Sequence, residues 1–264
     1  MRRGDVAVLS ISSVLAVIVV AAVSYSLLVL DRLPSSAAFG SEDRTSTWLV
    51  VTWAPSLCTV EPGNPGCASG HVGAMGHTWI LHGLWPQGSD NLYCGVPKDI
   101  ADRARNIHGS DMPAVDMRQD VRDNLDPIMS DAMVLAPHEW YTHGTCSGVT
   151  PDVYFSDAAA LTDQARTILD PLFADAEGTR ITLTTVRYRF DEQFGQGAGE
   201  RVGFSCRNVT GHGSVIYEAR LSLPPVPDLR GSGETQSGSE ALPLKELLVK
   251  APAVDEGCRH AHVP

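Results

Sequence analysis

The chain lacks the surplus of basic residues on which non-specific nucleic-acid binding depends. Its 264 residues include 20 lysines and arginines against 31 aspartates and glutamates, so the formal net charge is −11. This balance excludes a protein that coats phosphate backbones electrostatically. It leaves room for an enzyme that grips one or two phosphates locally. Hydrophobic residues make up 43% and charged residues 19%, an ordinary composition for a globular domain.

Closely spaced cysteines and internal repeats are also missing. Without a C-x-x-C pair, neither a zinc ribbon nor a thioredoxin-type redox motif is expected. The six cysteines instead stand singly along the chain. An even number in an exported chain predicts three disulfides, although spacing alone leaves their pairing open.

The N-terminus has the layout of an export signal. Arg2 and Arg3 precede a mostly apolar, uncharged stretch at residues 6–30, which is long enough to span a bilayer as a helix. We expect residues 1–40 to be a cleaved signal peptide or a single membrane anchor plus linker, in contact with the membrane or the export machinery. Residues 41–264 should then form one extracytoplasmic domain.

Residue patterns along this domain predict an α+β fold, in which several helices pack on a mainly antiparallel sheet. The segment between Cys58 and Cys67 is rich in proline and glycine and predicts a loop. Pro137 is expected in the first turn of a helix, and Pro171 is expected to disturb a long one. The predicted strands cover residues 46–54, 77–84, 200–206 and 214–223, and the predicted helices cover 99–107, 115–129, 136–147, 152–176 and 184–194.

Two short segments concentrate the chemistry of the chain. The first is WILHGLWP at residues 79–86, and the second is HEWYTHGTC at residues 138–146. Each sets histidine beside tryptophan, and the second adds a carboxylate. Imidazole gives and takes protons near neutral pH, and indole offers a flat face to a nucleobase. The segments predict acid–base chemistry on RNA, against the alternative that these rings merely pack in a core.

The spacing within the second segment bears on metal binding. The H-E-x-x-H motif of zinc proteases places its histidines four residues apart on one helix face. His138 and His143 are five apart, which turns the second ring to another side of a helix. Glu139 and His143 are four apart and would share a face. We therefore expect Glu139 to orient the His143 ring and favour its protonated form.

Both segments resemble the two active-site signatures of the ribonuclease T2 family, the secreted acid endoribonucleases that include the plant S-like enzymes. The family's first signature is an apolar strand running into HGLWP, and its second is HEW, two residues, then HGTC. The resemblance covers roughly residues 48–258. It takes in VTWAPSLC at 51–58 and IYEARL at 216–221, which are similar to the family's first and last strands.

The resemblance also implies a disulfide scheme. In the family, a cysteine just after the first signature is bonded to the cysteine of HGTC. Carried over by position, the pairs are Cys94–Cys146, Cys58–Cys67 and Cys206–Cys258.

The mechanism implied by the family is a transesterification that needs no metal and no cofactor. One imidazole removes the 2′-OH proton of single-stranded RNA, and the other protonates the departing 5′-oxygen, which leaves a 2′,3′-cyclic phosphate. His82 and His143 are the implied acid–base pair, and the sequence does not decide which is the base. His138 is implied to hold the phosphate, and Glu139 to support the transition state.

Three further residues are implied to bind the nucleobase. Trp85 would form a stacking wall, and Tyr93 would supply another ring. Gln87 stands where many relatives carry an acid that touches the base, which leaves base preference open. Trp140, by contrast, is expected to pack in the core.

One departure concerns the lysine that the family usually carries immediately before its second catalytic histidine. Thr142 stands there, and a hydroxyl cannot neutralise a phosphorane oxygen. Losing one such donor costs about 10²–10³ in rate. We therefore expect either a substitute cation or a slow enzyme.

The sequence thus predicts an exported or membrane-anchored, monomeric endoribonuclease of low base specificity. Two alternatives stay open. The Thr142 departure motivates a weakly active or inactive RNA-binding or toxin-like relative. A zinc hydrolase is the second alternative, and the histidine spacing argues against it.

Overall fold

A twisted, mostly antiparallel sheet organises the described residues of the computed structural model, which are 46–88, 91–105, 112–231 and 241–264. The strand order is β2-β1-β5-β6-β3, with β4 paired to β5, and only the β5–β6 pair is parallel. The predicted α+β class is confirmed. The strands are β1 Ser46–Trp53, β2 Trp79–Gln87, β3 Arg180–Thr182, β4 Val202–Val209, β5 Gly213–Leu223 and β6 His260–His262.

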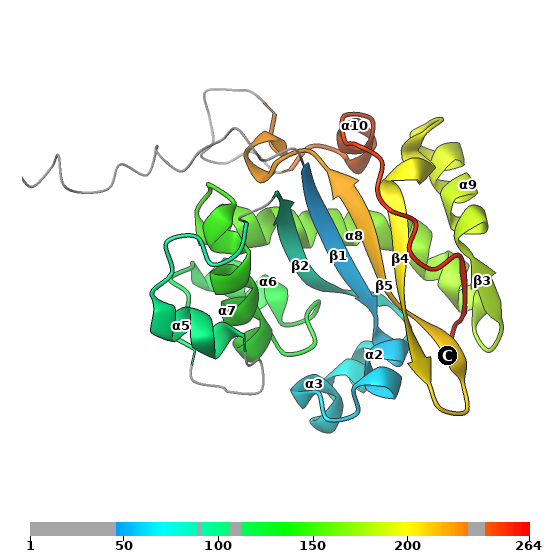
Figure 1. Ribbon diagram of the computed structural model, residues 1–264, viewed down its shortest axis with the longest axis horizontal. Helices are drawn as coiled ribbons and strands as arrows, with labels where there is room; N and C mark the ends of the chain where they lie inside the picture. Colours follow the sequence, from blue (N-terminus) through cyan, green and yellow to red (C-terminus); the bar gives the residue numbers. More distant parts are fainter. Residues whose placement is uncertain (1–45, 89–90, 106–111, 232–240) are drawn as a thin grey trace, which may run out of the picture. The chain divides into compact units, whose positions relative to one another are not determined.

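Helices surround this sheet on several sides (Figure 1). The long α8 runs behind it, while α5, α6 and α7 lie beside β2 and α9 lies beside β4 and β3. The helices are α2 Ala54–Val60, α3 Pro65–Ala68, α4 His71–Met75, α5 Lys98–Ala104, α6 Gln119–Leu125, α7 Ala132–Thr142, α8 Pro151–Ala176, α9 Leu183–Phe194 and α10 Leu244–Leu248.

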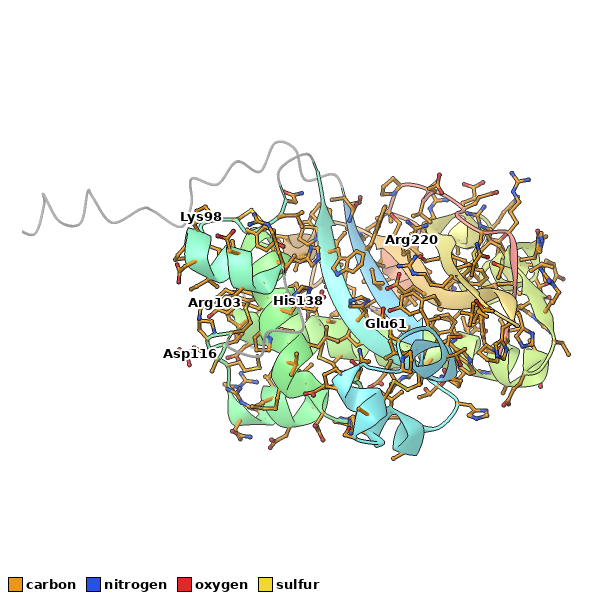
Figure 2. All side chains as sticks on the ribbon, turned by 60° about the horizontal axis from the view of Figure 1, so that its bottom comes forward. Glu61, Lys98, Arg103, Asp116, His138 and Arg220 are labelled. Carbon is orange, nitrogen blue, oxygen red and sulfur yellow. A yellow bond between two sulfur atoms is a disulfide. The ribbon has the colours of Figure 1, made fainter. Side chains whose placement is uncertain are left out.

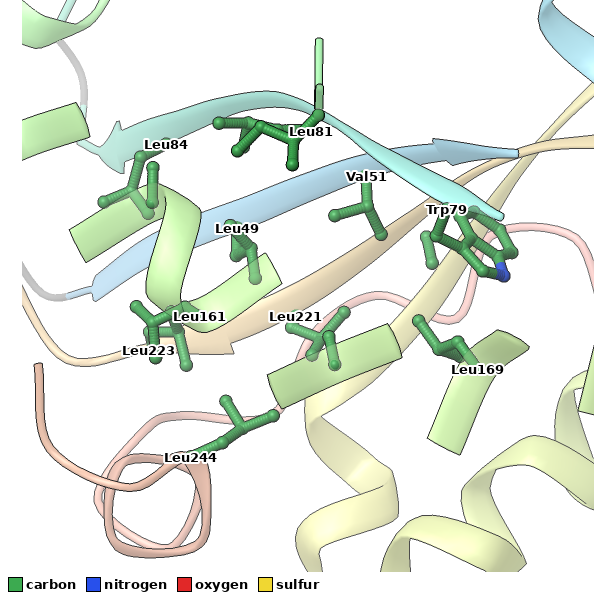
Figure 3. Close-up of a cluster of buried hydrophobic side chains, with 14 of the residues drawn as sticks. Leu49, Val51, Trp79, Leu81, Leu84, Leu161, Leu169, Leu221, Leu223 and Leu244 are labelled. Atoms are coloured by element: carbon green, nitrogen blue, oxygen red, sulfur yellow. The ribbon is translucent and has the colours of Figure 1, made fainter. Parts of the chain in front are cut away.

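The main hydrophobic core lies between the sheet and α8 (Figure 3). Alternate residues of β1, β2 and β5 point toward this side because successive strand side chains face opposite ways. Burying one such leucine or valine side chain contributes about 1.5–3 kcal/mol. This packing fixes the sheet, whose other face is then free to carry polar side chains. The core members drawn from these elements include Leu49, Val51, Leu81, Leu84, Leu161, Leu169, Leu221 and Leu223.

The predicted loop between Cys58 and Cys67 is shorter than expected and covers only residues 61–64. Helix α2 continues through Cys58 to Val60, and α3 begins at Pro65. Proline is well suited to the first turn of a helix, where its missing N–H costs nothing. The side chain of Asn64 also accepts a hydrogen bond from Gly66 N–H and caps α3. Turn-like residues therefore start helices here.

The two interior prolines also correct the sequence predictions. Helix α7 begins at Ala132, capped by the Asp131 side chain, so Pro137 lies inside the helix and not in its first turn. Helix α8 continues through Pro171 without a break. Pro171 and Thr167, whose carbonyl loses its helical partner, are both exposed. Water can bond that carbonyl, which removes much of the penalty.

All three predicted disulfides are present, as Cys58–Cys67, Cys94–Cys146 and Cys206–Cys258. Disulfides form and persist in oxidising compartments, which supports an extracytoplasmic location. The predicted signal or anchor and its boundary at residue 40 lie outside the described residues and stay predictions. Among the residues that the structure describes, no helix is long and apolar enough to cross a membrane.

Candidate active site

His82 stands at an irregularity in β2. In the β1–β2 register Val50 pairs with Gly83 and Val51 pairs with Leu81, so His82 has no partner. Such a β-bulge adds one residue to a strand and redirects its side chains. Successive strand side chains face opposite ways, so Leu81 points into the core while the His82 ring lies on the other face and meets Glu218 of β5. The extra residue explains why Leu84, three positions after Leu81, is in the core again.

The second segment lies at the end of α7. The helix carries His138 and Glu139 in its last turns and stops at Thr142, so that His143 is the residue that caps it. A single turn of 3-10 helix follows at Gly144–Cys146. The Cys94–Cys146 bond then ties this end of α7 to the loop that follows β2. The two segments are thus held side by side.

Glu139 joins the two segments. Its Oε2 accepts a hydrogen bond of 2.8 Å from Trp85 Nε1. Its Oε1 lies 3.5 Å from His82 Nε2 and 3.8 Å from His138 Nε2. Gly83 makes this approach possible, because a Cβ atom at that position would stand 1.8 Å from Glu139 Oε2. The glycine of the first signature is therefore required by packing against the carboxylate of the second.

The indole of Trp85 lies between the two candidate proton carriers. Its ring centroid is 5.2 Å from that of His82 in an edge-on arrangement and 4.9 Å from that of His143 in a stacked one. Both imidazoles therefore contact one indole ring. One face of Trp85 is covered by the stacked ring of His143. Figure 2 labels His138 on α7, beside β2, and Glu61 just after α2, near the ends of β1 and β2.

The expected pairing of Glu139 with His143 is wrong. The contacts of the Glu139 side chain are with Trp85, His82 and His138. What links positions 139 and 143 is the backbone, since His143 N–H donates to the Glu139 carbonyl at 2.9 Å. The prediction assumed a helix that continues through His143, whereas the helix ends one residue earlier.

The surroundings of His82 favour its charged form. Burial alone would lower its pKa, but the hydrogen bond to Glu218 and the negative charges of Glu139, Glu218 and Glu61 outweigh it. The pKa of His82 rises from 6.5 to about 9. The contact is His82 Nδ1 to Glu218 Oε1 at 2.8 Å. Because an ionised carboxylate only accepts, Nδ1 is the donor and Nε2 is left to face Glu139.

His143 has the opposite environment. Burial, followed by the nearby His138 and His82, lowers its pKa from 6.5 to about 3. This direction also contradicts the expected protonated form. The pKa of His138 is lowered as well, by burial and by His82 against the pull of the Ala104 carbonyl. Both rings are therefore neutral near pH 7.

The pKa of Glu139 is raised from 4.5 to about 7. Burial is the largest cause and Glu218 adds to it, whereas His82 and the Trp85 hydrogen bond act in the other direction. Its Oε1 is buried without a hydrogen-bond partner among the described residues. A buried carboxyl group in this state can carry a proton at mildly acidic pH and donate it to a bound anion.

Glu218 is the site residue that the sequence analysis missed. Its strand, IYEARL, was singled out, but this glutamate was given no role. The sequence did carry a signal, because Glu218 is a single carboxylate in a strand of mostly apolar residues. Burying such a carboxylate costs free energy unless it has a partner. That partner, His82, is 136 residues away along the chain, so the pair could not be seen in either local motif.

The predicted base-binding residues lie at the edge of this cluster. Gln87 Nε2 donates to the Trp85 carbonyl at 2.8 Å, at the end of β2. Tyr93 has a φ of 59°, which is rare for a residue with a side chain. Its N–H donates to the Thr142 carbonyl at 2.9 Å, and Arg105 lies 4.7 Å from its ring centroid. Neither Gln87 nor Tyr93 bonds to the histidines in the described parts.

The remaining predictions concern Trp140 and metal ligands. Trp140 packs against the core, with Tyr154 5.7 Å away between ring centroids. Its expected packing role is thus confirmed. Within the described ranges, no three or more His, Cys, Asp or Glu side chains are grouped as metal ligands.

The fold is α+β, and the two segments bring three imidazoles, a carboxylate and an indole into one cluster. Residues 45–231 match the model of the Ribonuclease T2 family. The chain therefore belongs to the ribonuclease T2 family.

Individual relatives support this assignment to different extents. The chain is 30% identical to ribonuclease MC of Momordica charantia over 109 residues, which is 40% of this chain and 49% of that protein. It is 25% identical to ribonuclease 1 of Arabidopsis thaliana over 219 residues, 79% of this chain and 86% of that one. The matches to ribonuclease MC and to a ribonuclease of Aeromonas hydrophila span about half of those proteins or less.

Solved structures show the same fold. A variant of ribonuclease MC1, solved in complex with 5′-UMP, superposes with a TM-score of 0.50 at 22% identity and covers 70% of this chain and 91% of that one. A second variant of the same protein also has a TM-score of 0.50, at 21% identity.

Proposed function

We propose that this chain is a metal-independent endoribonuclease that cleaves single-stranded RNA by transesterification, with low base specificity. The observation that carries the proposal is the pair His82 and His143, which contact one indole and have pKa values shifted in opposite directions. An acid and a base of this kind are what the reaction requires. Family membership and the disulfides support an exported enzyme that acts on RNA.

The opposite pKa shifts of the two rings support one assignment of the roles that the sequence left open. His143 is neutral and acts as the base. Its Nδ1 is buried without a partner among the described residues, so Nε2 is the atom that takes the 2′-OH proton. The 2′-oxygen then bonds to phosphorus. His82 is charged, and its Nε2 gives a proton to the 5′-oxygen as the P–O5′ bond breaks, which releases the cyclic phosphate.

Glu139 and His138 support the pentacovalent phosphorane. Below pH 7, Glu139 carries a proton in much of the population and can donate it to a phosphoryl oxygen. His138 has a neutral ring within 3.8 Å of Glu139, and it binds the phosphate as a hydrogen-bond donor. Fixed donors in a site of low dielectric constant stabilise the developing charge strongly. Trp85, Tyr93 and Gln87 bind the base.

The direct test incubates purified protein with RNA in EDTA and identifies the product ends by mass spectrometry. Fragments that end in 2′,3′-cyclic phosphate are expected, and an oligonucleotide with one 2′-deoxy position should resist cleavage only there. His82→Phe and His143→Phe should each abolish most of the activity. Unchanged cleavage in these variants, or cleavage that requires zinc, contradicts the proposal.

A weakly active or inactive RNA-binding relative is the second candidate. The side chain of Thr142 is buried, with its Oγ1 unpartnered among the described residues, and it brings no charge to the phosphate. Nucleotide binding in calorimetry together with no turnover of RNA would favour this candidate.

A further inference from the structure

Glu218 lies in the middle of β5, opposite Thr52 of β1. Its side chain is 8% exposed, and its Oε1 is 2.8 Å from His82 Nδ1. A buried carboxylate is costly unless a hydrogen-bonded partner of opposite charge compensates it. The His82 ring is such a partner, so the charged state of each group stabilises the charged state of the other.

The charged and titratable groups around His82 come from three elements of the fold. Glu218 comes from β5, Glu61 from the end of α2, and Glu139, His138 and His143 from α7 and its end. The three carboxylates are not equivalent. Glu139 is 3.5 Å from the ring and is bonded to Trp85. Glu61 accepts a hydrogen bond from the Tyr217 hydroxyl. Of these three carboxylates, only Glu218 is hydrogen-bonded to the ring in the described part of the chain.

We propose that Glu218 is a positioning residue for the acid of the reaction. It holds the His82 proton on Nδ1 and keeps the ring charged, so that Nε2 presents a second proton to the leaving oxygen before substrate arrives. A charged ring also gives the phosphate a cation in a site where Thr142 has replaced the family's lysine. This inference rests on the proposed function, since it concerns how that same site works.

A second histidine–glutamate pair shows why burial matters. His77 Nδ1 and Glu177 Oε2 are also 2.8 Å apart, but their side chains are 53% and 41% exposed. Water screens such a pair, and exposed ion pairs contribute little. The side chains of His82 and Glu218 are 23% and 8% exposed, so their attraction is screened far less. The raised pKa of His82 agrees with this difference.

The test uses Glu218→Gln in the full chain, because the amide oxygen can still accept the bond from Nδ1. In the free protein, the pKa of the His82 ring, followed by NMR, should fall by more than one pH unit. The alkaline limb of the kcat/KM profile should move to lower pH by the same amount. Glu177→Gln removes a carboxylate from the matched exposed pair and should leave the profile unchanged.

A change of leaving group separates this role from a purely structural one. Glu218→Gln should slow cleavage of a dinucleotide about 10–100-fold, a part of the 10²–10⁴-fold that a positioned acid supplies. It should have little effect on a nucleoside 3′-nitrophenyl phosphate, whose leaving group needs no proton. Equal losses on both substrates, or an unshifted pH profile, overturn the inference. A wild-type protein that cleaves neither substrate overturns the proposed function instead, and the NMR titration still decides the role of Glu218.

Discussion

The two candidate proton carriers differ in what surrounds them more than in how deeply they are buried. His82, on β2, faces carboxylates from β5, α7 and the end of α2, and its pKa rises to about 9. His143, after α7, faces other imidazoles, and its pKa falls to about 3. Burial lowers the pKa in both cases, so the neighbouring charges decide the outcome. Two histidines of one fold thus have pKa values shifted in opposite directions.

Removing either imidazole ring should cause the largest loss of activity. His82→Ala and His143→Ala should each lower kcat/KM about 10²–10⁴-fold, because each removes one proton-transfer group. Only His82→Ala should recover most of its activity on a nitrophenyl phosphate substrate. His77→Ala, a change at an exposed histidine, serves as the control and should retain full activity. Recovery by His143→Ala instead would reverse the assigned roles.

The contact between the two segments can be broken at Gly83. In Gly83→Ala the new Cβ would overlap the Glu139 carboxylate, and overpacking of this kind costs about 1–3 kcal/mol. We expect lower stability in denaturant titrations and at least a roughly tenfold loss of activity as the carboxylate moves. Gly73→Ala adds a Cβ that meets nothing within 4 Å and should be close to neutral in both assays. Similar results for both variants would show that the approach of Glu139 is unimportant.

The two rings should also act oppositely on stability. The lowered pKa of His143 means that the unfolded state binds its proton first, so stability is lost as pH falls from 6.5 toward 3. The raised pKa of His82 gives stability that is present below 6.5 and lost as pH rises through 9. His143→Asn should therefore reduce the loss of stability between pH 7 and pH 4 by about 1–3 kcal/mol, as measured by denaturant unfolding. An unchanged loss would contradict the low pKa.

The smallest expected effect is an increase in activity on replacing Thr142. Thr142→Lys restores the cation of the family pattern and should raise kcat/KM about tenfold, less than the full value of such a donor because position 142 is buried. Thr145→Lys, a lysine nearby in the same segment, is the control and should give no such rise. If Thr142→Lys leaves kcat/KM unchanged, the charged ring of His82 already neutralises the phosphate and no second cation is required.

The sequence predicted the site residues that lie within either of the two short segments. The two segments named His82, His138, Glu139 and His143, and the structure brings these together. The family pattern also supplied the disulfide pairs, which spacing alone could not. What the sequence could not supply was the end of α7 at Thr142, since helix patterns locate ends poorly.

The secondary structure was also predictable only where a local pattern was long enough. Long strands and the long α8 have periodic apolar residues and were predicted, whereas β3 and β6 have three residues each, too few for any pattern. Glu218 was missed for a different reason. Its role depends on the pairing of β5 with β1 and on the contact of its side chain with the His82 ring, and both belong to the tertiary structure.

The central claim is that His82 is charged and His143 neutral in the free protein, and the most direct measurement is an NMR titration of both imidazole rings in the wild-type chain. The account predicts that His82 holds its proton until about pH 9 and that His143 stays neutral down to about pH 3. Two rings that titrate together near 6.5, or in the reverse order, would contradict it.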